Sequence, residues 1–134
     1  MSKISPYSFL VLTFSMLAVA VTQAKELPLA PLYKPETIQA ASGAPAELKR
    51  AIRKAMYLKD WQIRDLAPGH LQGQFQKGDK YAIVVDVKYD AKTVSIGYRD
   101  SSGLNFSSDG TIHKTYNERV RDLEKAIRAE LDAF

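Results

Sequence analysis

The chain has two histidines, His70 and His113, and histidine is the side chain most often used for metal binding and acid–base catalysis. His70 lies beside a predicted turn and His113 opens the last predicted helix, so no HxxxH or HExxH spacing occurs. The segment from Asp100 to Asp109 is rich in side-chain oxygens, but it lacks the alternating carboxylates and the closing Glu of a calcium loop. The chain has no cysteine that could add a thiolate ligand. We therefore expect neither a metal site nor a cofactor.

A serine nucleophile beside His113 is the other catalytic arrangement that the sequence suggests. Four serines lie shortly before this histidine: Ser101, Ser102, Ser107 and Ser108. Asp100 or Asp109 could orient the imidazole, as in a Ser–His–Asp triad. No nucleophile elbow accompanies them, however, and serines beside Gly and Asp are typical of turns. We assign no catalytic residue and favour a protein that is not an enzyme.

The same region is the best candidate for a ligand-binding groove, between a long loop and the last helix. Aromatic and polar side chains could line it: Tyr98, Asp100, Asn105, Phe106, His113, Tyr116 and Asn117. A structural role is the alternative for these residues. Tyrosine rings pack in cores while their hydroxyls bind loop backbone, and a half-buried His113 could hydrogen-bond the preceding loop and fix it.

Period-two alternation of apolar residues predicts four strands in the middle of the chain, at 61–66, 71–76, 81–89 and 94–98. Short turns at 68–69, 77–79 and 90–92 join them, which is typical of an antiparallel meander with one apolar and one polar face. The polar face carries amides and charged groups: Gln62, Arg64, Gln72, Gln74, Asp86, Lys88, Ser95 and Arg99.

Two amphipathic helices flank this meander. The first begins near Pro45, since proline favours the first helical position, and ends around Leu58. Thr111 is the expected N-cap of the second helix. The apolar stripe of that helix has alternating spacings of three and four: His113, Tyr116, Val120, Leu123, Ile127 and Leu131. Because one sheet face needs a cover, the sequence predicts an α+β two-layer sandwich, in the order helix, four-stranded antiparallel meander, helix, with both helices on one sheet face.

The N-terminus has the three-part pattern of a secretory signal peptide. Lys3 precedes an apolar run from Phe9 to Val21, and small residues before Lys25 predict cleavage after Ala24. No cysteine follows, so a lipidation site is absent from this sequence. We therefore expect residues 1–24 to be a signal peptide and the remainder to be periplasmic. The remainder has no second apolar stretch of spanning length, so it is not expected to be integral to a membrane.

Residues 25–43 are predicted to form a Pro-rich extended arm, and residues 44–134 a single α+β domain. Pro28, Pro31 and Pro35 recur too closely for a helix or a central strand. Two interpretations of the arm stay open. It could lie on its own domain, or it could dock to another protein.

Charge limits the classes of partner. Removing Lys3 with the signal peptide leaves 18 of the 19 basic residues against 15 acidic ones, a net charge of +3. This surplus falls short of a nucleic-acid footprint, so we expect no nucleic acid as partner, but it allows loose attraction to an anionic envelope polymer. A basic cluster on the first helix is either a solvated face or a second place for such a polymer: Lys49, Arg50, Arg53 and Lys54.

The run from Ile96 to Phe106, followed by Ile112-His113 and Tyr116-Asn117, resembles a family of small secreted proteobacterial proteins. Members are often labelled uncharacterised proteins or lipoproteins. Further similar features lie upstream, so the resemblance covers roughly residues 45–131: Ala51-Ile52, Trp61 and the strand from Tyr81 to Tyr89. The chain departs from the family in lacking a lipidation cysteine and in having Arg119 where an aromatic residue is expected. The resemblance implies the helix–meander–helix order and a structural unit that joins the loop to residues 113–117, but no activity.

The sequence as a whole favours a non-enzymatic periplasmic binding or adaptor module of the bacterial cell envelope. Its partner would be a periplasmic or outer-membrane protein, or an anionic envelope polymer. The alternative is a small envelope-ligand binder or hydrolase with a pocket between the 100–110 loop and the last helix, around His113. The sequence does not determine the oligomeric state.

Overall fold

A computed structural model describes residues 28–41 and 43–133, so the predicted signal peptide lies outside the described residues. In chain order the elements are β1 (Leu29–Pro31), β2 (Ile38–Gln39), α2 (Pro45–Leu58), β3 (Gln62–Ala67), β4 (His70–Lys77), β5 (Tyr81–Tyr89), β6 (Thr93–Ser102), β7 (Thr111–His113) and α3 (Lys114–Asp132). In this part of the chain no helix is both long enough and apolar enough to cross a membrane.

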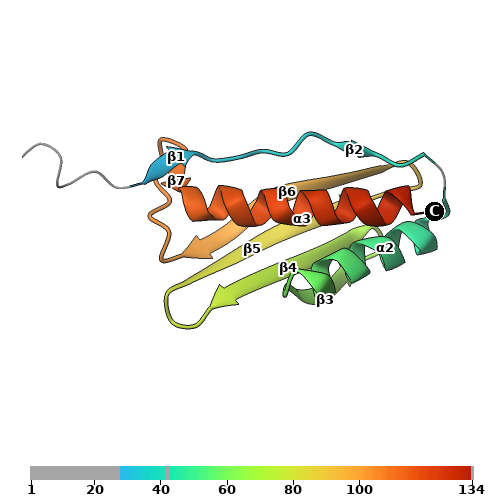
Figure 1. Ribbon diagram of the computed structural model, residues 1–134, viewed down its shortest axis with the longest axis horizontal. Helices are drawn as coiled ribbons and strands as arrows, with labels where there is room; N and C mark the ends of the chain where they lie inside the picture. The colour runs from blue at the N-terminus through green and yellow to red at the C-terminus, as the bar shows by residue number, and fades with distance from the viewer. Residues whose placement is uncertain (1–27, 42, 134) are drawn as a thin grey trace, which may run out of the picture.

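Five strands form the main sheet, in the order β2-β6-β5-β4-β3, and β1 pairs with β7 in a separate two-stranded sheet. All pairs are antiparallel, and β3 to β6 follow one another as a meander. Figure 1 shows α2 and α3 side by side over the same face of this sheet. The protein is therefore a two-layer α+β sandwich, as the sequence predicts. Two features differ from the prediction: β2 adds a fifth strand to the predicted four-stranded meander, and β1 and β7 form a second, small sheet.

The core lies between the helices and the sheet, and alternating strand residues point into it. In β5, Ile83, Val85 and Val87 are completely buried, which is the period-two pattern of a strand covered on one face. Gly73 of β4 lies in the same buried layer. A Cβ atom at this position would stand 2.6 Å from the terminal methyl carbon of Met56, so the absence of a side chain at Gly73 makes room for Met56.

The helix α2 begins and ends where the sequence predicts. Pro45 occupies its first helical position, where the missing N–H costs no helical hydrogen bond. The backbone N–H of Ala44 donates a hydrogen bond to the carboxylate of Glu47 at 3.1 Å, which fixes the first turn. The buried residues of α2 recur at helical spacing: Leu48, Ala51, Ile52, Ala55 and Met56.

The start of α3 differs from the prediction. Thr111 is not the N-cap, because Thr111 belongs to β7 and pairs with Pro31 of β1. The helix begins at Lys114, and His113 is its N-cap. The predicted loop also begins later than expected, because β6 continues through Asp100 to Ser102. The first difference arises because β7 pairs with β1, far away in the sequence, which a local pattern does not reveal. The second arises because the neighbouring strand β5 is long enough to pair with β6 as far as Ser102.

The arm lies on its own domain, along α3 and at the edge of the main sheet, where β2 pairs with β6 (Figure 1). Ile38 is only 2% exposed and belongs to the core. The side chain of Asn117 holds the arm backbone at two points, since its amide donates to the Pro31 carbonyl at 2.9 Å and its oxygen accepts from the Tyr33 N–H at 2.9 Å. The Tyr33 hydroxyl donates to the carboxylate of Glu124. The described part of the arm, residues 28–41, is thus tied to the domain by both backbone and side-chain hydrogen bonds.

Candidate functional site

Three of the predicted groove residues, Tyr98, Phe106 and Tyr116, do come together. The ring centroids of Tyr98 and Phe106 are 4.6 Å apart, and those of Tyr98 and Tyr116 are 5.5 Å apart in an edge-to-face arrangement. Tyr116 is buried, and this burial, together with the nearby Tyr98, raises the pKa of its hydroxyl far above the usual value. The Tyr98 hydroxyl is hydrogen-bonded to the Ser101 hydroxyl at 2.9 Å. These contacts pack the loop onto α3 and match the structural interpretation of the tyrosines.

His113 holds α3 and the loop together. Its Nδ1 accepts a hydrogen bond from the Thr115 backbone N–H at 3.1 Å, so the imidazole serves as the helix N-cap. Such a cap stabilises a helix by about 1 kcal/mol. The backbone N–H of His113 donates to the Leu104 carbonyl at 2.8 Å, and Leu104 is itself buried. One ring nitrogen of His113 is thus occupied by a structural hydrogen bond.

The other predicted groove residues lie elsewhere. Asn117 faces the arm, because consecutive helical residues point about 100° apart and its neighbour Tyr116 faces the core. The Asp100 carboxylate accepts a hydrogen bond from the Ser101 backbone N–H, and Asn105 is an exposed loop residue with a φ of 55°. The seven predicted residues therefore do not line one groove.

Of the four serines before His113, Ser101 and Ser102 belong to β6, and Ser107 helps to hold a turn. The carboxylate of Asp109 accepts hydrogen bonds from the Ser107 hydroxyl at 2.7 Å and from both the hydroxyl and the backbone N–H of Thr111. These hydrogen bonds hold the pKa of Asp109 below its usual range, and the one from Ser107 has the largest effect. Neither histidine is hydrogen-bonded to a serine hydroxyl within residues 28–41 and 43–133. The triad arrangement that the sequence suggested does not form there.

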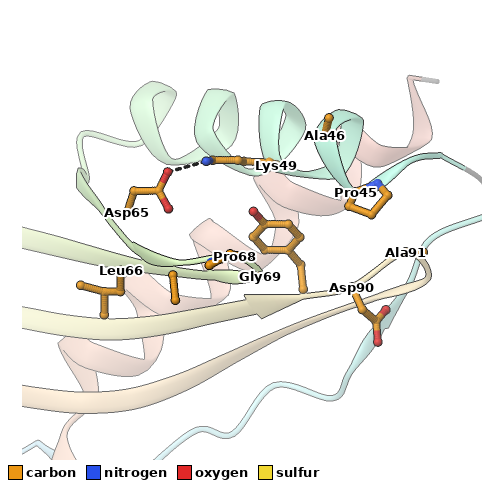
Figure 2. A pocket seen from close by; sticks show the side chains of 11 residues that line it. Pro45, Ala46, Lys49, Asp65, Leu66, Pro68, Gly69, Asp90 and Ala91 are labelled. Carbon is orange, nitrogen blue, oxygen red and sulfur yellow. Dashed lines mark hydrogen bonds and ion pairs between the residues drawn. The ribbon is translucent and has the colours of Figure 1, made fainter.

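A broad, open hollow of about 690 Å³ lies where the first turn of α2 meets the turns β3–β4 and β5–β6. Lys49 and Asp65 point toward one another across its side and form an ion pair (Figure 2). Asp90 points away from that pair, and its carboxylate accepts hydrogen bonds from the backbone N–H groups of Lys92 and Thr93. In this hollow the Lys49 and Asp65 side chains are thus paired with each other, and the Asp90 carboxylate is held by the backbone of its own turn.

The strongest cluster of charged side chains lies on the sheet face turned away from the helices, which we call the open face. His70 Nε2 and Asp86 Oδ1 are 2.8 Å apart, and Arg99 donates to the same Asp86 oxygen at 2.7 Å. Partial burial opposes ionisation of Asp86, but the hydrogen bonds from His70 and Arg99 outweigh it and lower the pKa of this carboxyl. The cluster joins β4, β5 and β6.

Strand register explains why these three side chains meet. Gln72 stands opposite Asp86, and His70 precedes Gln72 by two residues on the same face. On the other side, Gly97 stands directly opposite Asp86 and has no side chain, so Arg99 reaches the carboxylate past it. Asp86 and Arg99 belong to the predicted polar face, whereas the sequence pattern places His70 beside a turn. His70 stands diagonally across from Asp86 in the β4–β5 pair, and this register is the signal that could have predicted their contact.

No group of three or more His, Asp or Glu side chains that could hold a metal ion occurs among the described residues. No protein-family model matches the chain, and a search of the curated proteins finds no match. The resemblance to small secreted proteobacterial proteins stays a prediction. The fold and the site define a two-layer α+β protein in which the described residues leave one sheet face uncovered, with the cluster of His70, Asp86 and Arg99 on it.

Proposed function

We propose that this chain is a non-enzymatic binding module of the bacterial cell envelope, exported to the periplasm, and that it binds an anionic envelope polymer on its open face. The observation that carries this proposal is the cluster of His70, Asp86 and Arg99 on that face. The carboxylate at its centre is shared by two basic side chains, so the cluster does not repel a negatively charged ligand as a free carboxylate would.

Further cations on the open face support a ligand of negative charge. Arg64 and Lys88 lie on the same face, and neither forms an ion pair with the described residues. Gln72 and Gln74 add amide donors and acceptors between them. Because neighbouring strands lie about 4.8 Å apart, these groups offer an extended polymer regularly spaced contacts across the sheet.

The helix side of the molecule supports binding rather than catalysis. His113 caps α3, and Asn117 holds the arm, so both residues have structural partners. The aromatic rings beside them are packed on one another. This arrangement favours the binding module over a hydrolase or ligand pocket around His113.

The double variant Arg64→Gln/Lys88→Gln is expected to bind a soluble polyanion, polygalacturonate, at least roughly tenfold more weakly than the wild type. Both side chains are exposed, so the change removes charge without disturbing the core. Isothermal titration calorimetry at low and raised salt measures the effect. Binding by the wild type should weaken with salt, because attraction between exposed charges is screened.

The matched control is Arg50→Gln/Arg53→Gln, which removes two exposed cations from the outer face of α2. This variant should bind as the wild type does. A larger loss of affinity here than in the open-face variant would mean that the polymer binds on α2.

His113→Ala should lower the Tm, because the helix cap is lost, and should leave polymer binding unchanged. Loss of binding in this variant would instead support the ligand pocket around His113. A wild type that does not bind the polyanion at low salt overturns the proposal.

Export is tested separately. The chain recovered from a periplasmic extract should have the intact mass of a protein that begins at Lys25, because the small residues before that position fit the signal-peptidase pattern. Recovery of the full-length mass from the cytoplasmic fraction alone would contradict the localisation.

A further inference from the structure

His70 is a group on the open face whose charge depends on pH, because histidine changes its charge between pH 5 and 8. His70 begins β4, and Lys88 of β5 stands directly opposite it. The next pair in this register, Leu71 with Val87, is completely buried, so the alternation of the strands places His70 and Lys88 together on the open face. The other histidine of the chain caps α3, which covers the opposite face of the sheet (Figure 1).

The contact with Asp86 determines where His70 takes up a proton. Partial burial raises the pKa of Asp86, but the hydrogen bonds from His70 and Arg99 outweigh it, so this carboxyl is ionised from pH 5.5 to 8. An ionised carboxylate only accepts hydrogen bonds, and its Oδ1 lies 2.8 Å from Nε2 of His70. Nε2 therefore carries a hydrogen in the neutral ring, and protonation takes place at Nδ1. This step adds one positive charge and turns Nδ1 from an acceptor into a donor.

Charged groups from several strands lie around His70. Asp86 is the carboxylate that contacts it, whereas the Asp90 carboxylate is held by the backbone of its own turn. The positive charges oppose protonation of the ring, and the Asp86 carboxylate favours it. The cations come from three strands: Arg64 of β3, Lys88 of β5 and Arg99 of β6.

We propose that protonation of His70 regulates the open face, so that an anionic polymer binds more tightly at acidic than at alkaline pH. This inference rests on the proposed function. With His70 neutral, the charges of Asp86 and Arg99 cancel, whereas with His70 protonated the cluster has one positive charge. A bound polymer places negative charge beside the ring and so favours its protonated form. Because coupling between two binding events is reciprocal, the protonated form binds the polymer more tightly.

Isothermal titration calorimetry of the chain without a histidine tag, with polygalacturonate at low salt, tests the inference. The wild type should bind about fivefold more tightly at pH 5.5 than at pH 8, the effect of one added charge pair near the surface. Binding at pH 6.5 should be accompanied by net uptake of protons. This uptake is measured as a dependence of the observed heat on the ionisation enthalpy of the buffer.

Two variants assign the effect to one histidine. His70→Gln keeps an amide that can donate to Asp86 but does not titrate, so its affinity should be the same at both pH values. The matched control, His113→Asn, removes the other histidine and keeps a good N-cap residue, so it should retain the fivefold difference. Any titration of the polymer itself affects all three proteins equally. Circular dichroism checks that both variants keep the fold.

The outcomes separate this inference from the proposed function. Equal affinity of the wild type at both pH values overturns the inference and leaves polymer binding in place. A pH dependence that persists in His70→Gln, or that is lost in His113→Asn, overturns it as well. If His70→Gln does not fold, proton uptake by His113→Asn decides, because His70 is then the one histidine left. A wild type that binds at neither pH contradicts the proposed function and this inference with it.

Discussion

Gly103→Ala is expected to lower the free energy of unfolding by about 2–5 kcal/mol. Gly103 follows β6 with a φ of +75°, and this left-handed conformation costs a residue with a Cβ about 1–2 kcal/mol. In addition, a Cβ at this position would stand 2.2 Å from the backbone carbonyl oxygen of Lys80. Backbone atoms have little freedom to move aside, so overpacking adds about 1–3 kcal/mol. Urea unfolding followed by circular dichroism measures the loss.

Gly78→Ala is the matched control. Gly78 also has a positive φ, of +52°, but a Cβ there would meet nothing within 4 Å. Its substitution should therefore lower the free energy of unfolding only by the cost of the left-handed conformation, about 1–2 kcal/mol. Equal losses at Gly103 and Gly78 would mean that the approach of the loop to Lys80 is not a tight contact in solution.

Ile38→Ala is expected to lower the free energy of unfolding by about 2–5 kcal/mol and the Tm by at least about 8 °C. Ile38 pairs with Val94 at the edge of the main sheet and is 2% exposed, so truncation leaves a cavity in the core. Differential scanning calorimetry measures the change. The result would mean that the arm is part of the folded domain.

Leu29→Ala tests the same arm at an exposed position. Leu29 is 41% exposed, and its truncation should change the stability by about 0.5 kcal/mol or less. Similar, small losses at Ile38 and Leu29 would contradict the packed arm and would fit a segment that docks to another protein instead.

Patterns that repeat within one element predicted most of the fold. The alternation of Ile83, Val85 and Val87 and the helical spacing of the buried residues in α2 each depend on neighbours in the sequence, so the sequence predicts β5 and α2 correctly. The short strands β1, β2 and β7 were missed. Each has only two or three residues, and each forms because a distant segment supplies its partner.

The candidate site was predicted less completely, for a related reason. Tyr98, Phe106 and Tyr116 were found because aromatic residues near one loop tend to pack together. Asn117 was assigned to the same groove, but its partners are backbone groups of the arm more than 80 positions earlier in the chain. The pairing of His70 with Asp86 depends on the register between β4 and β5, which the turn at 78–80 sets and the sequence pattern leaves open.

The glycine in β4 has a consequence for chemical durability. From residue 28 to 133 the chain contains one sulfur atom, that of Met56, since it has no cysteine and its other methionines lie in the first 16 residues. The space above Gly73 receives the end of this side chain and keeps it completely buried. Oxidation of a thioether adds a polar oxygen and requires access by the oxidant. The fold thus shields the one oxidisable side chain of this kind among the residues that the structure describes.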